Sequence, residues 1–219
     1  MKVRPSIPGV LHLEFPNRKE LTLSMCRIEE FYESPYDNIR SNVFTWEDFL
    51  DAYMKDDGEV DYFGYWDGFN VPGNVVCSFF CDRVREFSNR ENAIYRVWQH
   101  SKTEYLIATQ EGCAQDIVEH ELAHARYYLN QNYKARMDKA IANFGTENMY
   151  ALTQGLLSDT RYADNPELLN DEIQAYLATS EYPELEQKFP LLPSWEIIRL
   201  QRLYSGILGE FKKEEQCAS

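Results

Sequence analysis

Two histidines and a glutamate in the middle of the chain have the types and spacing needed to bind a metal ion and use it for hydrolysis. His120 and His124 are four residues apart, so on a helix with 3.6 residues per turn both imidazoles lie on one face and can reach the same ion. Glu121 lies about 100° round the helix from His120, beside that ion rather than among its ligands. Two imidazoles suit zinc, and a carboxylate next to metal-bound water can accept its proton. The pattern therefore predicts a hydrolytic metal centre, provided that the helix forms and a third ligand exists.

The segment that contains the motif has the composition of a helix, and we expect it to run from about Cys113 to Asn130. Polar residues in the middle of an otherwise buried helix require partners, and a metal ion is one way to supply them. Before this helix, the β-favouring runs 93–99 and 104–110 predict a hairpin, and Gly112 breaks the second strand. The sequence thus predicts a strand that leads directly into the metal-binding helix.

The remaining apolar patterns predict an α+β fold with a mainly helical C-terminal half. The runs 10–15 and 21–26 are short and β-favouring, so they predict an N-terminal hairpin. Thr45 is a suitable N-cap for a short helix over 46–54. Apolar residues at helical spacing predict further helices over 74–87, 134–144, 147–157, 171–179 and from 194 onward. We therefore expect a small mixed or antiparallel sheet packed on the helix that carries the motif.

The length of 219 residues is suited to one folding domain. We predict a single domain over 1–219, with a β-rich N-terminal part over 1–110 and a helical part over 111–219 that carries the metal site. The hydrophobic content of 44% and charged content of 26% are typical of globular proteins. The net charge of −14 argues against partners that are themselves negatively charged, so we expect neither nucleic acid nor membrane as a partner.

The cysteines and the apolar runs bear on the compartment. The chain has five cysteines, an odd number without any Cys-x-x-Cys pair, which favours reduced thiols over a disulfide framework. No stretch approaches the roughly 18 to 20 consecutive apolar residues of a membrane span, and the N-terminus has no apolar core of secretory length. These observations predict a cytoplasmic protein.

In its His-Glu-x-x-His motif, placed on a helix after β structure, the chain resembles the zincin metallopeptidases. The resemblance implies that His120 and His124 bind one Zn²⁺ ion and that Glu121 is the general base that deprotonates the zinc-bound water. It also implies a peptide or protein substrate that pairs with an exposed edge of the sheet, for which one strand of the 93–110 hairpin is the expected partner. Side-chain pockets, including the loop 66–70, would then provide selectivity.

The third ligand separates subgroups of zincins. No histidine follows His124 in the sequence, so the third histidine of the metzincins is absent. A downstream carboxylate makes the site gluzincin-like, and we choose Glu172 because acids there stand beside small and apolar residues on a predicted helix. Asp171 and Glu181 are the alternatives, and His100 is an upstream one. The thermolysin-like gluzincins place an aspartate four residues after this ligand, whereas Tyr176 stands here, so the subgroup stays open.

The expected activity is that of a zinc metallopeptidase. Three protein ligands leave the fourth position on zinc for water, and Glu121 would pass the proton of that water to the leaving amine. The oxyanion needs a further donor, a role for which we select Tyr176, with the alternatives Tyr162, Arg161 and Tyr127.

Two other classes of function stay open at this point. One is a zinc-binding or sensor module without proteolysis, although zinc binding alone would not require Glu121. The other is a catalytically silent interaction protein in which the histidines are structural. Tightly bound zinc separates this second class from the hydrolase. The sequence gives no indication of oligomeric state.

Overall fold

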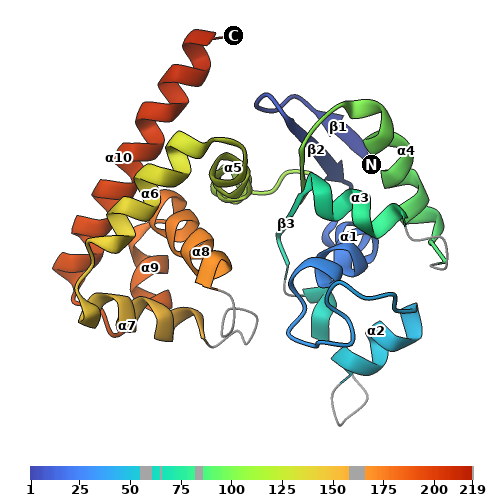
Figure 1. The fold of residues 1–219 in the computed structure, drawn as a ribbon, viewed down its shortest axis with the longest axis horizontal. Coiled ribbons are helices and arrows are strands. Elements are labelled where there is room, and N and C mark those ends of the chain that lie inside the picture. The colour runs from blue at the N-terminus through green and yellow to red at the C-terminus, as the bar shows by residue number, and fades with distance from the viewer. Residues whose placement is uncertain (55–60, 65, 82–85, 158–165, 219) are drawn as a thin grey trace. The chain divides into compact units, whose positions relative to one another are not determined.

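The fold is that of a computed structural model, which describes residues 1–54, 61–64, 66–81, 86–157 and 166–218. Its contacts divide the chain into two compact units, Met1–Glu121 and Leu122–Ser219 (Figure 1). Each unit has its own hydrophobic core. The boundary falls within helix α5 (Gln115–Leu129), which carries the motif. In the described residues, no helix has the length and apolarity that crossing a membrane requires.

The described strands of the first unit form one mixed sheet, as expected for the predicted α+β class. Its order is β1 (Lys2–Arg4), β2 (Val10–Phe15), β4 (Tyr105–Gln110) and β3 (Gly68–Pro72). The two central strands β2 and β4 are parallel, whereas β1 and β3 pair antiparallel with their neighbours. Within this sheet β1 and β3 are the edge strands. The strand predicted over 104–110 is therefore confirmed, but it lies in the interior of the sheet.

Helices cover the apolar face of this sheet. Leu11 and Leu13 on β2 and Leu106 and Ala108 on β4 belong to one core, which the helices of the first unit complete. These helices are α1 (Arg18–Glu33), α2 (Trp46–Tyr53), α3 (Gly73–Cys81) and α4 (Asn89–Ser101), with a 3-10 turn η1 (Asp61–Gly64) before β3. The predicted helix over 46–54 is confirmed, and Thr45 and Asp48 form its capping box. The predicted helix over 74–87 is confirmed as far as Cys81. Residues 82–85 lie outside the described part, and residues 86 and 87 are not helical.

The strand predicted over 21–26 is wrong, because these residues lie in α1. Leu21, Met25 and Ile28 are fully buried at the spacing of a helical stripe, and the side chain of Asn17 accepts a hydrogen bond from Glu20 N as the N-cap. The alternation of apolar and polar residues over 21–25 fits a strand equally well over so short a run. The N-cap at Asn17 and the apolar stripe that continues to Ile28 favour the helix.

The strand predicted over 93–99 is also wrong, because it lies in α4. Ser88 and Glu91 form a capping box at its start, and Lys102 ends it in the left-handed conformation with φ of 54°. Ile94 and Trp98 are buried one helical turn apart. The Ser-x-x-Glu spacing is the sequence signal for this helix that the β-favouring composition obscured.

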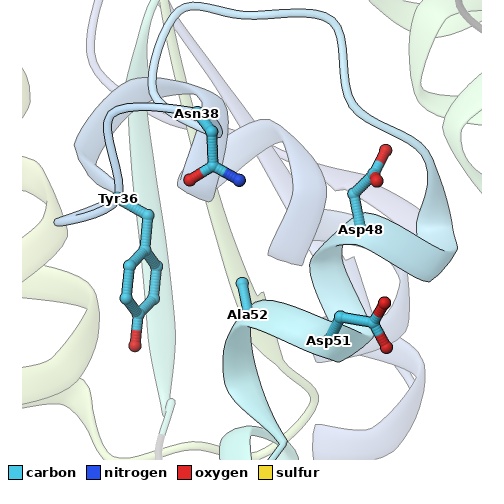
Figure 2. Close-up of a pocket in the computed structure, with 5 residues that line it drawn as sticks. All are labelled: Tyr36, Asn38, Asp48, Asp51 and Ala52. Atoms are coloured by element: carbon cyan, nitrogen blue, oxygen red, sulfur yellow. The ribbon is translucent and has the colours of Figure 1, made fainter.

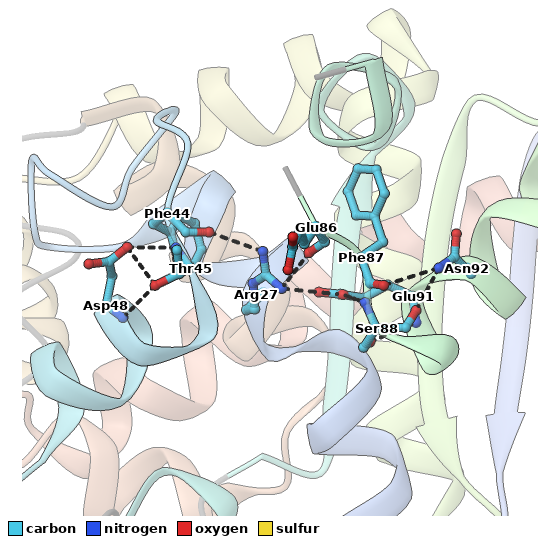
Figure 3. Close-up of polar contacts among 9 residues, drawn as sticks. All are labelled: Arg27, Phe44, Thr45, Asp48, Glu86, Phe87, Ser88, Glu91 and Asn92. Carbon is cyan, nitrogen blue, oxygen red and sulfur yellow. Dashed lines mark hydrogen bonds and ion pairs between the residues drawn. The ribbon is translucent and has the colours of Figure 1, made fainter. Parts of the chain in front are cut away.

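A buried arginine joins α1 to α4. Arg27 donates to the backbone carbonyls of Phe44 at 3.0 Å and of Glu86 at 3.2 Å, and its guanidinium lies 3.4 Å from the Glu91 carboxylate (Figure 3). The side chains of Arg27 and Glu91 are 5% and 3% exposed. Glu91 therefore both caps α4 and neutralises a charge that α1 places in the core of the first unit.

The second unit contains helices α6 to α10 around a second core. They are α6 (Gln131–Ala142), α7 (Thr146–Leu156), α8 (Pro166–Thr179), α9 (Tyr182–Lys188) and α10 (Ser194–Ala218). The helices predicted over 134–144, 147–157 and 171–179 and from residue 194 are confirmed. The segment between α8 and α10, which its prolines predict to be a loop, contains α9, with Pro183 in the first turn, where a missing N–H costs nothing. The charged residues 212–215 lie within α10.

Candidate metal centre

The motif lies on α5, which confirms the helix predicted over 113–130. Strand β4 ends at Gln110, and Gly112 turns the chain with a φ of 74°, a conformation that suits glycine. The helix begins at Gln115, so His120 and His124 follow after one and two further turns. The helical spacing that the motif requires is therefore present.

Three ligand atoms converge at the motif. The side chains of His120, His124 and Glu172 each offer one atom, and these atoms all lie within 4.8 Å of one another. His124 and Glu172 are buried, with 2% and 8% of their surface exposed, and His120 is half-buried. Among the described residues this is the group of histidine, cysteine and acidic side chains that is close enough to hold an ion.

The geometry of this group fits zinc. His124 Nε2 lies 3.7 Å from Glu172 Oε1. In a tetrahedral site with bonds of about 2.0–2.2 Å, neighbouring ligand atoms are roughly 3.4 Å apart. The observed separation is thus close to what the ion requires, and the donor set of two imidazoles and one carboxylate is one that zinc prefers.

Asp171 occupies a position beside the ligands. Its Oδ1 lies 2.9 Å from His124 Nδ1, the ring nitrogen on the side away from Glu172. An ionised carboxylate only accepts hydrogen bonds, so it selects the tautomer of His124 with the proton on Nδ1 and the lone pair on Nε2. The alternative ligand Asp171 therefore has the geometry of a residue that orients His124.

The contact between Asp171 and His124 continues into the core of the second unit. Gln174 Nε2 donates to Asp171 Oδ1 at 2.9 Å, and Tyr133 OH donates to Gln174 Oε1 at 2.9 Å. Gln174 and Tyr133 are fully buried. Burial raises the pKa of Tyr133 far above its ordinary value, so the phenol stays protonated and remains a donor. The four side chains form an unbroken hydrogen-bonded chain that ends on the ring of His124.

Glu121 is held by the edge strand β3. Asn70 Nδ2 donates to Glu121 Oε2 at 2.9 Å, and Tyr105 OH donates to Asn70 Oδ1 at 2.6 Å, which defines the orientation of the amide. Gly68 lies against the same carboxylate, and a Cβ at this position would stand only 2.8 Å from Glu121 Cδ. Gly68 and Asn70 point to one face because they are two residues apart on a strand. Gly68 leaves space for the Glu121 carboxylate, and Asn70 donates a hydrogen bond to it.

The position of Glu121 changes the expected substrate edge. The edge was expected on the 93–110 hairpin, but 93–99 is helical and β4 pairs on both sides. Strand β3 is the edge of the sheet beside Glu121 instead. Strand β3 overlaps the segment 66–70, which was expected to be a loop that contributes only to substrate selectivity.

The other candidate ligands lie elsewhere. Glu181 is the exposed N-cap residue of α9. His100 is exposed near the end of α4, where its Nδ1 lies 2.7 Å from Arg96 O. Neither belongs to the group of converging ligand atoms, so Glu172 is the candidate that the geometry favours.

The candidates for the oxyanion donor have different surroundings. The Tyr176 ring packs edge-on against Phe189 at a centroid distance of 6.2 Å, with Lys188 Nζ 4.8 Å from its centre. These contacts involve the ring of Tyr176 and the end of α9. They give no information on its hydroxyl, so the catalytic role of Tyr176 stays a prediction. Tyr127 is buried and its hydroxyl donates to Asp138, which leaves it unsuited to that role. Arg161 and Tyr162 lie outside the described residues.

Sequence reasoning missed the residues that surround the ligands. Asp171 was expected only as a ligand, Gly68 and Asn70 only as parts of the selectivity loop 66–70, and Gln174 had no expected role. An acid directly before a ligand on a helix is a weak signal, since acids are common in this chain. Asn70 and Gly68 are 51 and 53 residues from Glu121 in the sequence, so only the pairing of β3 with β4 brings them together.

No family model matches the chain, and neither a curated protein nor a solved structure matches it.

Proposed function

We propose that this protein is a zinc-dependent hydrolase, most specifically a peptidase, with His120, His124 and Glu172 as the ligands of one Zn²⁺ ion. The observation that carries the proposal is the convergence of these three ligand atoms within 4.8 Å. Glu121 follows His120 on the same helix, and Asn70 orients its carboxylate. A zinc site without hydrolysis would not require a base that is held in this way.

Each residue has a defined task in this proposal. When bound, zinc would lower the pKa of a coordinated water toward ~7 and polarise a carbonyl group. Glu121 accepts a proton from the attacking water and then delivers it to the leaving amine, which converts a poor leaving group into a neutral one. Asp171 holds His124 in the tautomer that binds the ion. Tyr176, four residues after Glu172, is the proposed donor to the oxyanion.

The register of the sheet supports a peptide as substrate. Tyr105 N donates to Gly9 O, and Gly73 N donates to Glu104 O. In an antiparallel pair the hydrogen-bonding direction alternates, so the backbone groups of Gly68 and Asn70 turn away from β4 toward the outer edge of the sheet. An extended peptide that pairs there would lie beside Glu121. Pro72 has no N–H to offer, which would limit this pairing at one end.

We also propose a reducing compartment, the cytoplasm. The five cysteines, Cys26, Cys77, Cys81, Cys113 and Cys217, are free thiols in the structure. Three of them are exposed, and free exposed thiols persist where the surroundings are reducing.

Metal analysis and two substitutions test the proposal. We expect one equivalent of zinc in the purified protein and cleavage of fluorescein-labelled casein or of a peptide library read by mass spectrometry. His124→Ala should remove the metal, whereas Glu121→Gln should retain it and lose at least ~100-fold in rate, since general-base catalysis contributes about 10²–10⁴-fold. His100→Ala and Glu147→Gln change exposed residues of the same types and should change neither property.

The outcomes separate the classes of function. Less than one equivalent of zinc would overturn the metal centre, and full activity of Glu121→Gln would overturn the assigned base. Zinc binding without cleavage of any casein or library peptide would leave a zinc-binding module in place of a peptidase.

A further inference from the structure

A pocket of about 290 Å³ lies between α6 and α10 in the second unit. Its apolar lining includes Phe144, which is buried two residues after the end of α6, and Leu203, which is partly exposed on α10. Three basic side chains also line the pocket: Arg136, Lys139 and Arg199. The two helices pack against each other, and residues of both line the pocket. We call it the α6/α10 groove.

The described charged side chains that line this groove are all basic, whereas the chain as a whole is acidic. The chain has 36 acidic and 22 basic residues and a net charge of −14, yet the described lining of the groove contains three basic residues and no acidic one. A pocket of the first unit shows the contrast, because its lining, as far as the structure describes it, contains Asp48 and Asp51 and no basic residue (Figure 2). Asp48 is already engaged in the capping box of α2. Arg136 and Arg199 have acidic partners outside this lining, so Lys139 carries the positive charge that these ion pairs leave unbalanced.

The guanidinium groups of the groove are held in fixed orientations. Arg199 Nε lies 2.8 Å from Glu196 Oε2, with a second contact of 2.5 Å between Nη2 and Oε1. Arg136 Nη1 lies 2.7 Å from Glu210 Oε2. A guanidinium has five N–H donors, so these ion pairs leave further donors to bind an additional carboxylate. Lys139 is exposed and makes no ion pair with a described residue.

A row of exposed side chains extends the groove along α10. Trp195, Arg199 and Leu203 follow each other at intervals of four residues, which places them in one row on the helix. Trp195 is 67% exposed and Leu203 is 40% exposed. Tryptophan, arginine and apolar side chains around a pocket form the composition of binding hot spots rather than of an ordinary solvated surface.

We infer that the α6/α10 groove docks an acidic amphipathic helix of a partner protein. A groove between two packed helices accepts a third helix along its apolar face. The pocket takes one large apolar side chain of that helix, and Trp195 covers the next one. Acidic residues on either side of the apolar face bind Lys139 and the free donors of Arg136 and Arg199. This inference does not depend on the metal centre.

Two synthetic peptides test this inference on the full-length protein. Both are fluorescein-labelled, have roughly four helical turns and share one leucine stripe, but one has glutamate and the other lysine on its polar face. Fluorescence anisotropy should show binding of the glutamate peptide that weakens as salt is added, and at least ~10-fold weaker binding of the lysine peptide. Lys139→Glu should lower the affinity for the glutamate peptide by about 5-fold, and Trp195→Ala should lower it by about 10-fold.

The controls isolate the groove. Arg96→Glu makes the same charge change on an exposed residue of α4 and should leave the affinity unchanged. All three protein variants change exposed side chains, and the unfolding temperature of each checks that it is folded. Equal affinity for both peptides, no binding of either, or insensitivity to both groove substitutions would overturn the inference. A dimer in sedimentation analysis that Trp195→Ala dissociates would assign the groove to a second copy of the chain instead.

Discussion

At the scale of single residues, the candidate centre depends on which ring nitrogen of His124 carries the proton and which one faces the ion. Asp171 accepts from Nδ1 and thereby leaves the lone pair of Nε2 facing Glu172. Gln174 and Tyr133 in turn hold the aspartate, so a fully buried phenol is linked to the ligand through two intermediate side chains. Such partners of a ligand are typically worth 10–100-fold in metal affinity.

Zinc affinity tests this hydrogen-bonded chain without any substrate. Asp171→Asn should weaken zinc binding by at least ~10-fold, and Tyr133→Phe should weaken it by roughly 3-fold, because Gln174 then loses the partner that orients its amide. Competition with a chromophoric chelator measures both effects.

Tyr204→Phe is the matched control for Tyr133→Phe. Tyr204 is fully buried in the same core, but its hydroxyl donates at 3.4 Å to the backbone oxygen of Met137 and not to the chain that ends on His124. It should change stability without changing zinc affinity. Equal losses of affinity in both variants would show that Tyr133 acts through packing alone.

The space that Gly68 leaves for Glu121 leads to a second prediction at this scale. A methyl group at Gly68 would overlap the Glu121 carboxylate, whereas one at Gly64 would meet no atom within 4 Å. Gly68→Ala should therefore lower the rate of hydrolysis by at least ~10-fold and leave the zinc content unchanged, because small displacements of a positioned group are costly. Gly64→Ala should retain the activity of the original protein. A fully active Gly68→Ala variant would contradict the proposed position of the base.

At the scale of secondary-structure elements, α1 and α4 are joined by two ion pairs of different burial. The pair of Arg27 and Glu91 lies in the core of the first unit. The pair of Arg90 and Glu20 joins the same two helices at the surface, with 44% and 37% of the side chains exposed. Because both ion pairs join the same two helices, they allow the contribution of a buried pair to stability to be compared with that of an exposed pair.

Substitution of each arginine measures this difference. Arg27→Met leaves the Glu91 carboxylate buried without its partner and should lower the free energy of unfolding by about 3–5 kcal/mol. Arg90→Met removes a pair that water screens and should cost less than about 1 kcal/mol. Urea denaturation of both variants provides the comparison, and equal losses would mean that the buried pair contributes no more than the surface pair.

At the scale of the whole molecule, the candidate centre links elements that are distant in the sequence. His124 lies on α5 and Glu172 on α8, 48 residues later. An ion shared by these helices would stabilise the folded state in proportion to its affinity and concentration. The second unit would then depend on metal for part of its stability.

Removal of the metal tests this dependence. At zinc concentrations of about 100 times the dissociation constant, the gain is roughly 2.7 kcal/mol, which corresponds to an increase in unfolding temperature on the order of 10 °C. Scanning calorimetry should show this increase with zinc and its loss with a chelator. His124→Ala should be insensitive to both additions, and an equal response of this variant would place the stabilising ion elsewhere.

Local signals in the sequence were sufficient for a large part of this protein. The spacing of His120 and His124 and the apolar periodicity around them predicted α5, and the same periodicity predicted α6, α7, α8 and α10 but not α9. Each of these elements is long enough for a helical period to be distinguished from alternation. The short runs at 21–26 and 93–99 were not, and there the caps at Asn17 and Ser88 decided for helix.

Tertiary structure alone decided which residues surround the motif. Asp171 and Glu172 are adjacent acids on one helix, and only their placement toward the two nitrogens of His124 separates a residue with ligand geometry from one that orients the ring. The edge strand beside Glu121 likewise follows from pairing, because a strand is an edge or a centre according to its neighbours and not to its composition. Helical period and capping depend on residues within a few positions of each other, whereas the surroundings of a site depend on contacts between residues about 50 positions apart.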